Sequence, residues 1–137
     1  GCGADYWSEF ANITGGGWVS GTSFHPPYSN FAVKVSQPGH SGAAGVSDFN
    51  TDDELYMGIE YKDGNDIFLT GASEEGTWPW GPDRAPTHMP AGTFPLAWTR
   101  SYGDGKVFTL LLGHDGKSFK SPEFQKIVLN GVNWATA

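Results

Sequence analysis

The sequence contains very little cysteine, few basic residues and no long hydrophobic run. Its single cysteine, Cys2, excludes an internal disulfide and any site of the Cys-x-x-Cys type. Lysine and arginine together number 8 against 15 acidic residues, which gives a net charge of −7. Such a chain repels phosphate backbones, so no nucleic-acid partner is expected. No apolar stretch approaches the roughly 20 residues of a membrane-spanning helix, so no membrane span is expected either.

These absences do not decide where the protein works. The opening residues, Gly1 to Asp5, lack the pattern of a signal peptide. Cys2 so close to the start leaves a lipid-modified N-terminal cysteine open. We favour a cytoplasmic location and keep a secreted or lipid-anchored origin as the alternative.

What is present fits one folded unit over residues 1–137. Hydrophobic residues make up 38% of the chain and aromatic residues 15%, which argues against a disordered segment. The 20 glycines and nine prolines indicate many turns and loops. We find no internal repeat and no linker.

The first half predicts one short helix and three strands. A helix is expected over residues 6–13, ended by the glycines at 15–17. Residues 31–35 alternate as a strand does. Residues 54–61 alternate cleanly, and we predict that they pair with the short apolar strand 67–69 as a hairpin.

The second half predicts a hairpin and a terminal helix. Strands over 96–101 and 106–112 flank the turn 102–105. The second strand is apolar on both faces, as in a central strand covered on both sides. Ser121 and Pro122 suit a helix start, and the helix is expected to continue to Ala135. Its expected core face combines six residues, Phe124, Ile127, Val128, Gly131, Trp134 and Ala135.

Between these halves, residues 73–94 show no periodicity. This segment contains Trp78, Trp80, Arg84 and His88 among several prolines. A loop of this length in a compact domain is usually functional. Its tryptophans either contact a ligand or pack the loop.

Several motifs occur in a fixed order along the chain. A Pro-x-x-Trp strand and a Tyr-Gly-x-Gly-Lys-Val-Phe turn span 95–108, and Leu-Gly-His-Asp follows at 112–115. The last helix closes on Gly-x-x-Trp-Ala at 131–135. Upstream stand His40 and the Asp-Glu-Leu-Tyr segment at 53–56. This combination resembles the ThuA-like, or trehalose-utilisation, family of the class I glutamine amidotransferase-like superfamily.

The resemblance implies a flavodoxin-like three-layer α/β fold, here with β-hairpins and a C-terminal helix. The parallel βα units with which the family's domain begins precede the segment that matches Tyr6 onward, and they are missing. The chain is therefore expected to be an incomplete domain. Strands 67–69 and 107–112 would then lack partners. An exposed apolar surface and self-association follow as expectations.

The expected catalytic residues are His114, Asp115 and Glu54. His114 follows an apolar strand, and ligands bind outside such strand ends in open α/β sheets. In the related amidotransferases the base histidine also follows a late strand, so His114 resembles that position. A neighbouring carboxylate such as Asp115 can orient it. The structural alternatives are that His114 only caps its strand and that Glu54 only bonds backbone amides.

The expected substrate-binding residues are His40, Tyr56, Trp78 and Trp80. We expect them to converge with His114, Asp115 and Glu54 in one cleft, with 73–94 as its wall. Tryptophan faces beside carboxylates suit the C–H faces of sugar rings. The expected ligand is therefore a sugar-like polyol and not a phosphorylated metabolite.

No cofactor is expected. Cys2 lacks the strand-to-helix elbow that an amidotransferase nucleophile requires, which disfavours a glutaminase. His40 and His114 with carboxylates from separate loops could hold a divalent metal, although no short histidine spacing supports this. Two functions stay open. One is an enzyme of trehalose or related sugar metabolism that performs acid–base chemistry, and the other is a sugar-binding or scaffolding domain without catalysis.

Overall fold

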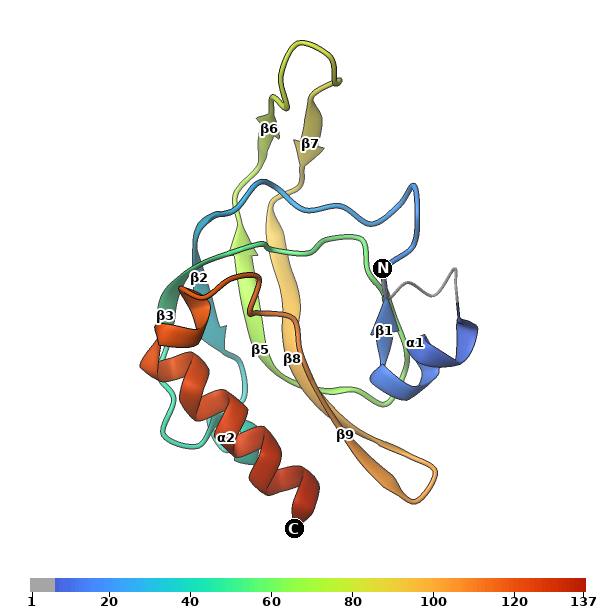
Figure 1. Cartoon of the computed structure of the whole chain (residues 1–137), viewed down its shortest axis with the longest axis vertical. Helices are drawn as coiled ribbons and strands as arrows, with labels where there is room; N and C mark the ends of the chain where they lie inside the picture. The colour runs from blue at the N-terminus through green and yellow to red at the C-terminus, as the bar shows by residue number, and fades with distance from the viewer. Residues whose placement is uncertain (1–6) are drawn as a thin grey trace.

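The computed structural model describes residues 7–137, so Cys2 and the other residues of 1–6 lie outside the described part of the chain. A curled five-stranded sheet forms its centre (Figure 1). In spatial order its strands are β3 (Phe49–Asp53), β2 (Ser29–Val35), β5 (Asp66–Ser73), β8 (Gly92–Tyr102) and β9 (Gly105–Leu110). Every strand pair among residues 7–137 is antiparallel.

Smaller elements surround this sheet. Two short strand pairs are β1 (Gly16–Gly17) with β4 (Glu60–Tyr61), and β6 (Gly76–Trp78) with β7 (Thr87–Met89). Two 3-10 turns are η1 (Ser41–Ala43) and η2 (Ser118–Lys120). The β6–β7 hairpin projects from the body of the molecule (Figure 1).

Helices cover both faces of the β8–β9 hairpin. The side chains of Trp98 and Thr109, which pair across the two strands, both donate to the Thr14 carbonyl at the end of helix α1 (Ser8–Thr14). Phe108, one position along, lies against Gly131 of helix α2 (Pro122–Thr136). Successive side chains of a strand point to opposite faces, so α1 and α2 lie on opposite sides.

Both helices begin and end as their sequences predict. The α1 helix ends at Gly15, whose φ of 86° is open to glycine at little cost. At the start of α2, the Ser121 hydroxyl accepts from the Phe124 amide, and Pro122 stands at the first position. The predicted bounds of both helices are confirmed to within two residues.

The buried stripe of α2 is narrower than predicted. Phe124, Ile127 and Gly131 are buried, whereas Val128 is 38% exposed. Trp134 is partly exposed beneath the Lys106 ammonium, which lies 5.4 Å from its ring centroid. The prediction that Trp134 and Ala135 belong to the core is wrong, because the C-terminal end of α2 lies against the exposed start of β9, where Lys106 donates to the Trp134 and Ala137 carbonyls.

The predicted strand over 54–61 is wrong, and so is its pairing with 67–69. Strand β3 already ends at Asp53, and only Glu60–Tyr61 form a strand, paired with β1. Leu55 and Met57 are nonetheless buried in the core, and Met57 forms a two-way backbone bridge with Phe24. The alternation therefore reflected burial correctly, but β5 pairs with β2 and β8.

The β8–β9 hairpin is confirmed, with its turn at Tyr102 to Gly105. The prediction that this strand is central is wrong, because β9 is an edge strand of the five-stranded sheet, although α1 and α2 both contact it. The segment 73–94 was predicted as a loop, and it contains the β6–β7 hairpin and the start of β8. These strands are too short to show periodicity in the sequence.

The described part of the chain is thus a mixed α/β structure with a curled sheet and a C-terminal helix. The helices among residues 7–137 are all too short or too polar to cross a bilayer.

Candidate functional site

The buried carboxylate of Asp53 ties the end of β3 to the segment that follows β9. Its side chain is only 1% exposed and accepts four hydrogen bonds. The donors are the backbone amides of Glu54 (2.8 Å), Gly113 (2.7 Å) and His114 (3.2 Å) and the Ser118 hydroxyl (2.7 Å). Two of these residues are predicted catalytic residues, so Asp53 holds their backbones next to each other.

Beside this anchor, Glu54 stands at the centre of a polar group that we call the Glu54 cluster, made of His25, Glu54, Tyr56 and His114. The Glu54 side chain is 14% exposed. Its Oε2 atom lies 3.1 Å from His114 Nδ1 and accepts a 3.1 Å hydrogen bond from the Tyr56 hydroxyl. Its Oε1 atom lies 3.7 Å from His25 Nδ1. One carboxylate therefore faces two imidazoles and a phenol.

The environment of Tyr56 keeps its hydroxyl protonated. Burial, followed by the hydrogen bond to the Glu54 carboxylate, raises the pKa of Tyr56 to about 12. At neutral pH the residue is therefore a fixed donor to Glu54.

His114 presents one nitrogen to Glu54 and is otherwise accessible. Because the carboxylate faces Nδ1, it favours a proton on that nitrogen and leaves Nε2 as the basic atom. The side chain is 45% exposed, so a ligand can approach it. The Tyr28 ring lies 5.7 Å away, centroid to centroid. This arrangement suits a general base.

Asp115 does not orient His114, although it is adjacent in sequence. Its Oδ1 atom accepts from the Lys117 amide (2.7 Å) and the Tyr28 hydroxyl (3.1 Å). The Lys117 amide is the main reason why the pKa of Asp115 lies below its usual value. The orienting carboxylate is Glu54, and Asp115 stands at the edge of the site through Tyr28.

His25 is the residue of the cluster that sequence reasoning missed. Its Nδ1 atom lies 2.7 Å from the Pro26 carbonyl, which requires a proton on Nδ1 and leaves Nε2 as an acceptor in the neutral ring. The sequence did carry a signal. His25 lies upstream of the Asp-Glu-Leu-Tyr segment as His40 does, but only His40 was included in the motif.

His40 does not join the Glu54 cluster, and its predicted place in that cleft is wrong. Its Nδ1 atom accepts from the Gly42 amide and caps η1. Its Nε2 atom lies 3.0 Å from the Thr99 hydroxyl, and its ring stacks on Phe68 at 4.4 Å. The side chain is 7% exposed. These contacts make His40 a buried structural residue.

The two loop tryptophans separate in the structure. Trp80 has its ring 6.4 Å from that of His25, donates to the Thr87 hydroxyl and carries the Arg84 guanidinium 3.8 Å above its ring. It therefore stands beside the cluster. Trp78 lines a different hollow of about 520 Å³, together with Met89 and Leu55.

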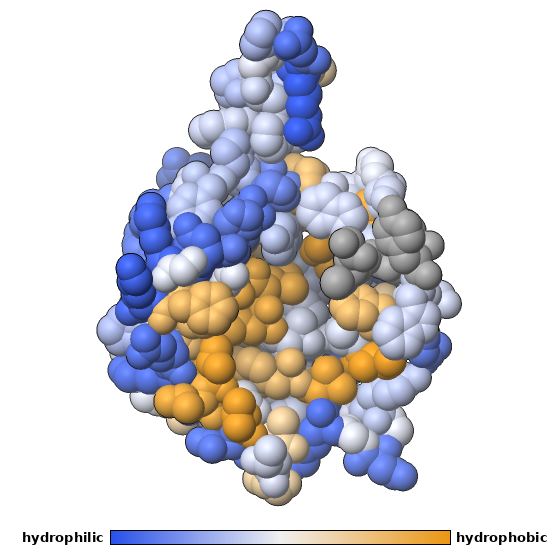
Figure 2. All heavy atoms as spheres, viewed as in Figure 1, coloured by the Kyte–Doolittle hydropathy of each residue, from blue (hydrophilic) through white to orange (hydrophobic). Residues whose placement is uncertain are grey.

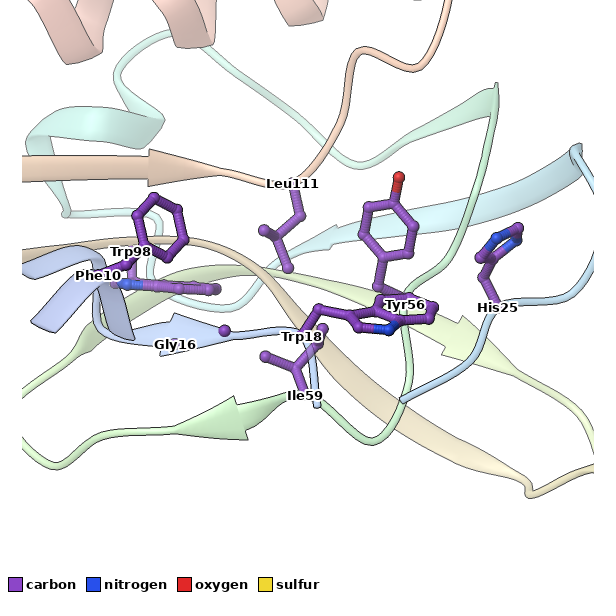
Figure 3. Close-up of a pocket in the computed structure, with 9 residues that line it drawn as sticks. Phe10, Gly16, Trp18, His25, Tyr56, Ile59, Trp98 and Leu111 are labelled. Atoms are coloured by element: carbon purple, nitrogen blue, oxygen red, sulfur yellow. The ribbon is translucent and has the colours of Figure 1, made fainter. Parts of the chain in front are cut away.

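An aromatic cavity of about 420 Å³ adjoins the cluster (Figure 3). Two of its residues, His25 and Tyr56, belong to the cluster as well. The cavity is lined by Phe10, Gly16, Gly17, Trp18, His25, Tyr56, Ile59, Trp98 and Leu111.

Within residues 7–137, no three histidine, cysteine, aspartate or glutamate side chains gather in an arrangement that could hold a metal ion.

Comparisons with known proteins fit this architecture. A ThuA-like protein from Parabacteroides merdae superposes with a TM-score of 0.71 at 21% identity, over 96% of this chain and 56% of its own. A ThuA-like protein from Bacteroides uniformis gives 0.66 at 17% identity, over 95% of this chain and 51% of its own. The chain thus spans about half the length of these structures. No curated protein matches it significantly.

The model of the ThuA family, described as trehalose utilisation, matches residues 1–135. The match covers nearly the whole sequence, as the ordered motifs led us to expect. The chain therefore belongs to the ThuA family.

Proposed function

We propose that the protein acts in carbohydrate metabolism, on trehalose or a related disaccharide or keto-sugar, and that the Glu54 cluster performs acid–base chemistry on the sugar. The observation that carries this proposal is one largely buried carboxylate between two imidazoles. Carboxylate–histidine pairs of this kind move protons near neutral pH.

In this proposal the chemistry centres on His114. The Nε2 atom of the neutral ring takes a proton from the sugar, either from a hydroxyl or from a carbon next to a ketone. The Glu54 carboxylate, 3.1 Å from Nδ1, stabilises the imidazolium that forms. Asp115 is a positioning residue that acts through Tyr28, and Tyr56 and Trp80 contact the substrate. No cofactor is needed, and chelators should leave turnover unchanged.

We also place the chain in the class I glutamine amidotransferase-like superfamily on its sequence motifs. Helices on both faces of the β8–β9 hairpin are compatible with a layered α/β domain. A glutaminase reaction is not proposed, since the candidate nucleophile Cys2 has no strand-to-helix elbow in the sequence.

The alternative is a sugar-binding or scaffolding domain without catalysis. In such a domain the Glu54 cluster would hydrogen-bond sugar hydroxyls without transferring protons.

Turnover and binding measured together separate the two functions. Trehalose, glucose and their keto derivatives are incubated with the wild type and with His114→Asn, Glu54→Gln and a matched control, His88→Asn on the exposed face of β7. The enzyme reading expects turnover that falls by about a hundredfold in the first two variants, a usual share for general acid–base catalysis, and is unchanged in the control.

Binding without turnover, weakened in the same two variants, would instead favour the non-catalytic domain. Absence of both binding and turnover would overturn both readings.

We further propose that the isolated chain self-associates through its exposed apolar surface. Figure 2 shows hydrophobic side chains gathered over α2 and the middle of the face in view. Phe119, Leu129 and Val132 are 58%, 62% and 56% exposed. Leu129 and Val132 are neighbours one turn apart on α2, and exposed apolar residues that adjoin in this way are typical of contact surfaces.

A further inference from the structure

The cavity beside the Glu54 cluster has mostly apolar walls. The rings of Trp18 and Tyr56 meet edge to face at 5.9 Å, and the buried Trp98 lines the cavity as well (Figure 3). Aliphatic side chains of Ile59 and Leu111 complete it. These groups offer ring faces and hydrocarbon to an occupant.

The polar atoms on this wall are largely engaged elsewhere. The Trp98 indole donates to the Thr14 carbonyl at 2.7 Å, and the Tyr56 hydroxyl donates to Glu54. His25, whose Nδ1 faces the Pro26 carbonyl, keeps Nε2 for other partners. A sugar ring placed here would leave most of its hydroxyls without hydrogen bonds, which costs free energy. A flat apolar group has no hydroxyls to leave unpaired.

The size of the cavity fits such a group. Small-molecule sites commonly measure about 300–1,000 Å³, and an apolar cavity of about 150 Å³ already accepts benzene. At about 420 Å³, the cavity has room for a two-ring aromatic system.

The cavity and the cluster share two side chains, so one ligand can occupy the cavity and contact the cluster at the same time. The Tyr56 ring lines the cavity while its hydroxyl bonds Glu54, and His25 lines the cavity while facing Glu54 at 3.7 Å. We propose that the cavity is a subsite for the aromatic aglycone of a glycoside, whose sugar extends to the Glu54 cluster. The sugar end of this ligand rests on the proposed function, whereas the aromatic end rests on the cavity alone.

Calorimetry with three probes tests the subsite: 2-naphthol, 2-naphthyl glucoside and methyl glucoside. We expect the naphthyl glucoside to bind at least about tenfold tighter than the methyl glucoside, which corresponds to about 1.4 kcal/mol. Leu111→Phe fills the cavity and should abolish this preference. Leu129→Phe, the same change on the exposed face of α2, should preserve it.

Circular dichroism establishes that each variant is folded, and Ile59→Phe replaces Leu111→Phe if that variant is not. Equal affinities for the two glucosides in the wild type would overturn the subsite and leave the proposed function intact. So would a naphthyl preference that persists in the filled variant. Binding of naphthol without binding of methyl glucoside would support the subsite and count against the proposed function.

Discussion

The Glu54 carboxylate lies 3.1 Å from His114 Nδ1, although the two residues come from opposite ends of the fold. Glu54 follows β3 at one edge of the sheet, and His114 follows β9 at the other edge. The curl of the sheet brings these edges together, and Asp53 binds both backbones. The geometry of the site therefore depends on a buried residue that no ligand needs to touch.

Asp53→Asn is expected to destabilise the protein. Asparagine is neutral, so all four hydrogen bonds lose their charge assistance. It also has one acceptor oxygen where the carboxylate has two, so the two donors at one of these oxygens lose their acceptor. Losing bonds to a buried charged group costs about 2–4 kcal/mol. Urea unfolding measures this loss.

Asp63→Asn in an exposed turn is the matched control and should leave the free energy of unfolding unchanged. Equal stability of the Asp53→Asn variant and the wild type would show that Asp53 is not the anchor described above.

His40→Ala should lower stability without affecting ligand binding. The change removes the Phe68 stack, the Thr99 contact and the η1 cap, which together amount to about 2–3 kcal/mol. Thermal unfolding measures the first effect, and calorimetry with the best-binding sugar measures the second. If the variant is folded but no longer binds the sugar, His40 contributes to the ligand-binding site after all.

The different outcomes for His40 and His25 show what sequence patterns could predict. Helix ends and the β8–β9 hairpin are determined by residues close together in the sequence, so they could be predicted correctly from the capping and turn residues. The convergence of Glu54 and His114 was predicted from strand ends and family motifs. His25 lies in a segment without periodicity. Its ring contacts with Trp18, Tyr56 and Trp80 form only in the folded chain.

The strand predicted over 54–61 failed for a related reason. Alternation reports which side chains are buried and not which backbone they pair with. Leu55 and Met57 are buried as the pattern indicates, but Phe24 supplies the bridge. An isolated β-bridge between two residues far apart in the sequence produces no recognisable sequence pattern.

Tyr56 should make stability fall at alkaline pH. Its pKa is raised to about 12 in the folded chain, against about 10 for an unperturbed tyrosine. A raised pKa contributes stability that is fully present below pH 10 and is lost as the pH rises towards 12. Melting temperatures between pH 8 and pH 12 should therefore fall less steeply in Tyr56→Phe than in the wild type.

Burial raises the pKa of Tyr61 to about 12 as well. Tyr61→Phe should therefore also make the melting temperature fall less steeply over this pH range. Thr109→Val, which changes no titrating group, is the control and should retain the wild-type slope. A Tyr56→Phe slope equal to that of the wild type would mean that Tyr56 is not protected in the folded state.

Self-association of the isolated chain should depend on α2. Replacing the exposed Leu129 and Val132 with glutamate places charge on the apolar surface and should shift the chain to monomer. Sedimentation velocity over a concentration series measures this shift. Thr77→Glu, exposed on the β6–β7 hairpin away from α2 (Figure 1), adds charge off that surface and should leave association unchanged. A wild-type chain that stays monomeric at every concentration would contradict the proposal.

The charge of the ligand provides the last test. We expect the site to bind neutral sugars more tightly than sugar phosphates, because Glu54 faces the ligand and the net charge of the chain is −7. Two cations lie at the edge of the site, and each already lies over an aromatic ring. Arg84 is 3.8 Å from the Trp80 ring centroid, and Lys117 is 5.5 Å from that of Tyr28. These contacts occupy the ring faces and leave the two cations as the groups through which a phosphate would have to bind.

Calorimetry with glucose, trehalose and glucose 6-phosphate, at low and high salt, measures this preference. Arg84→Gln and Lys117→Gln should keep the affinity for the neutral sugars to within a few-fold. Tighter binding of the phosphate, with an affinity that falls as salt rises and is lost in either variant, would reverse the assignment. The two cations would then be the ligand-binding groups, and the carboxylate of Glu54 would serve only to position His114.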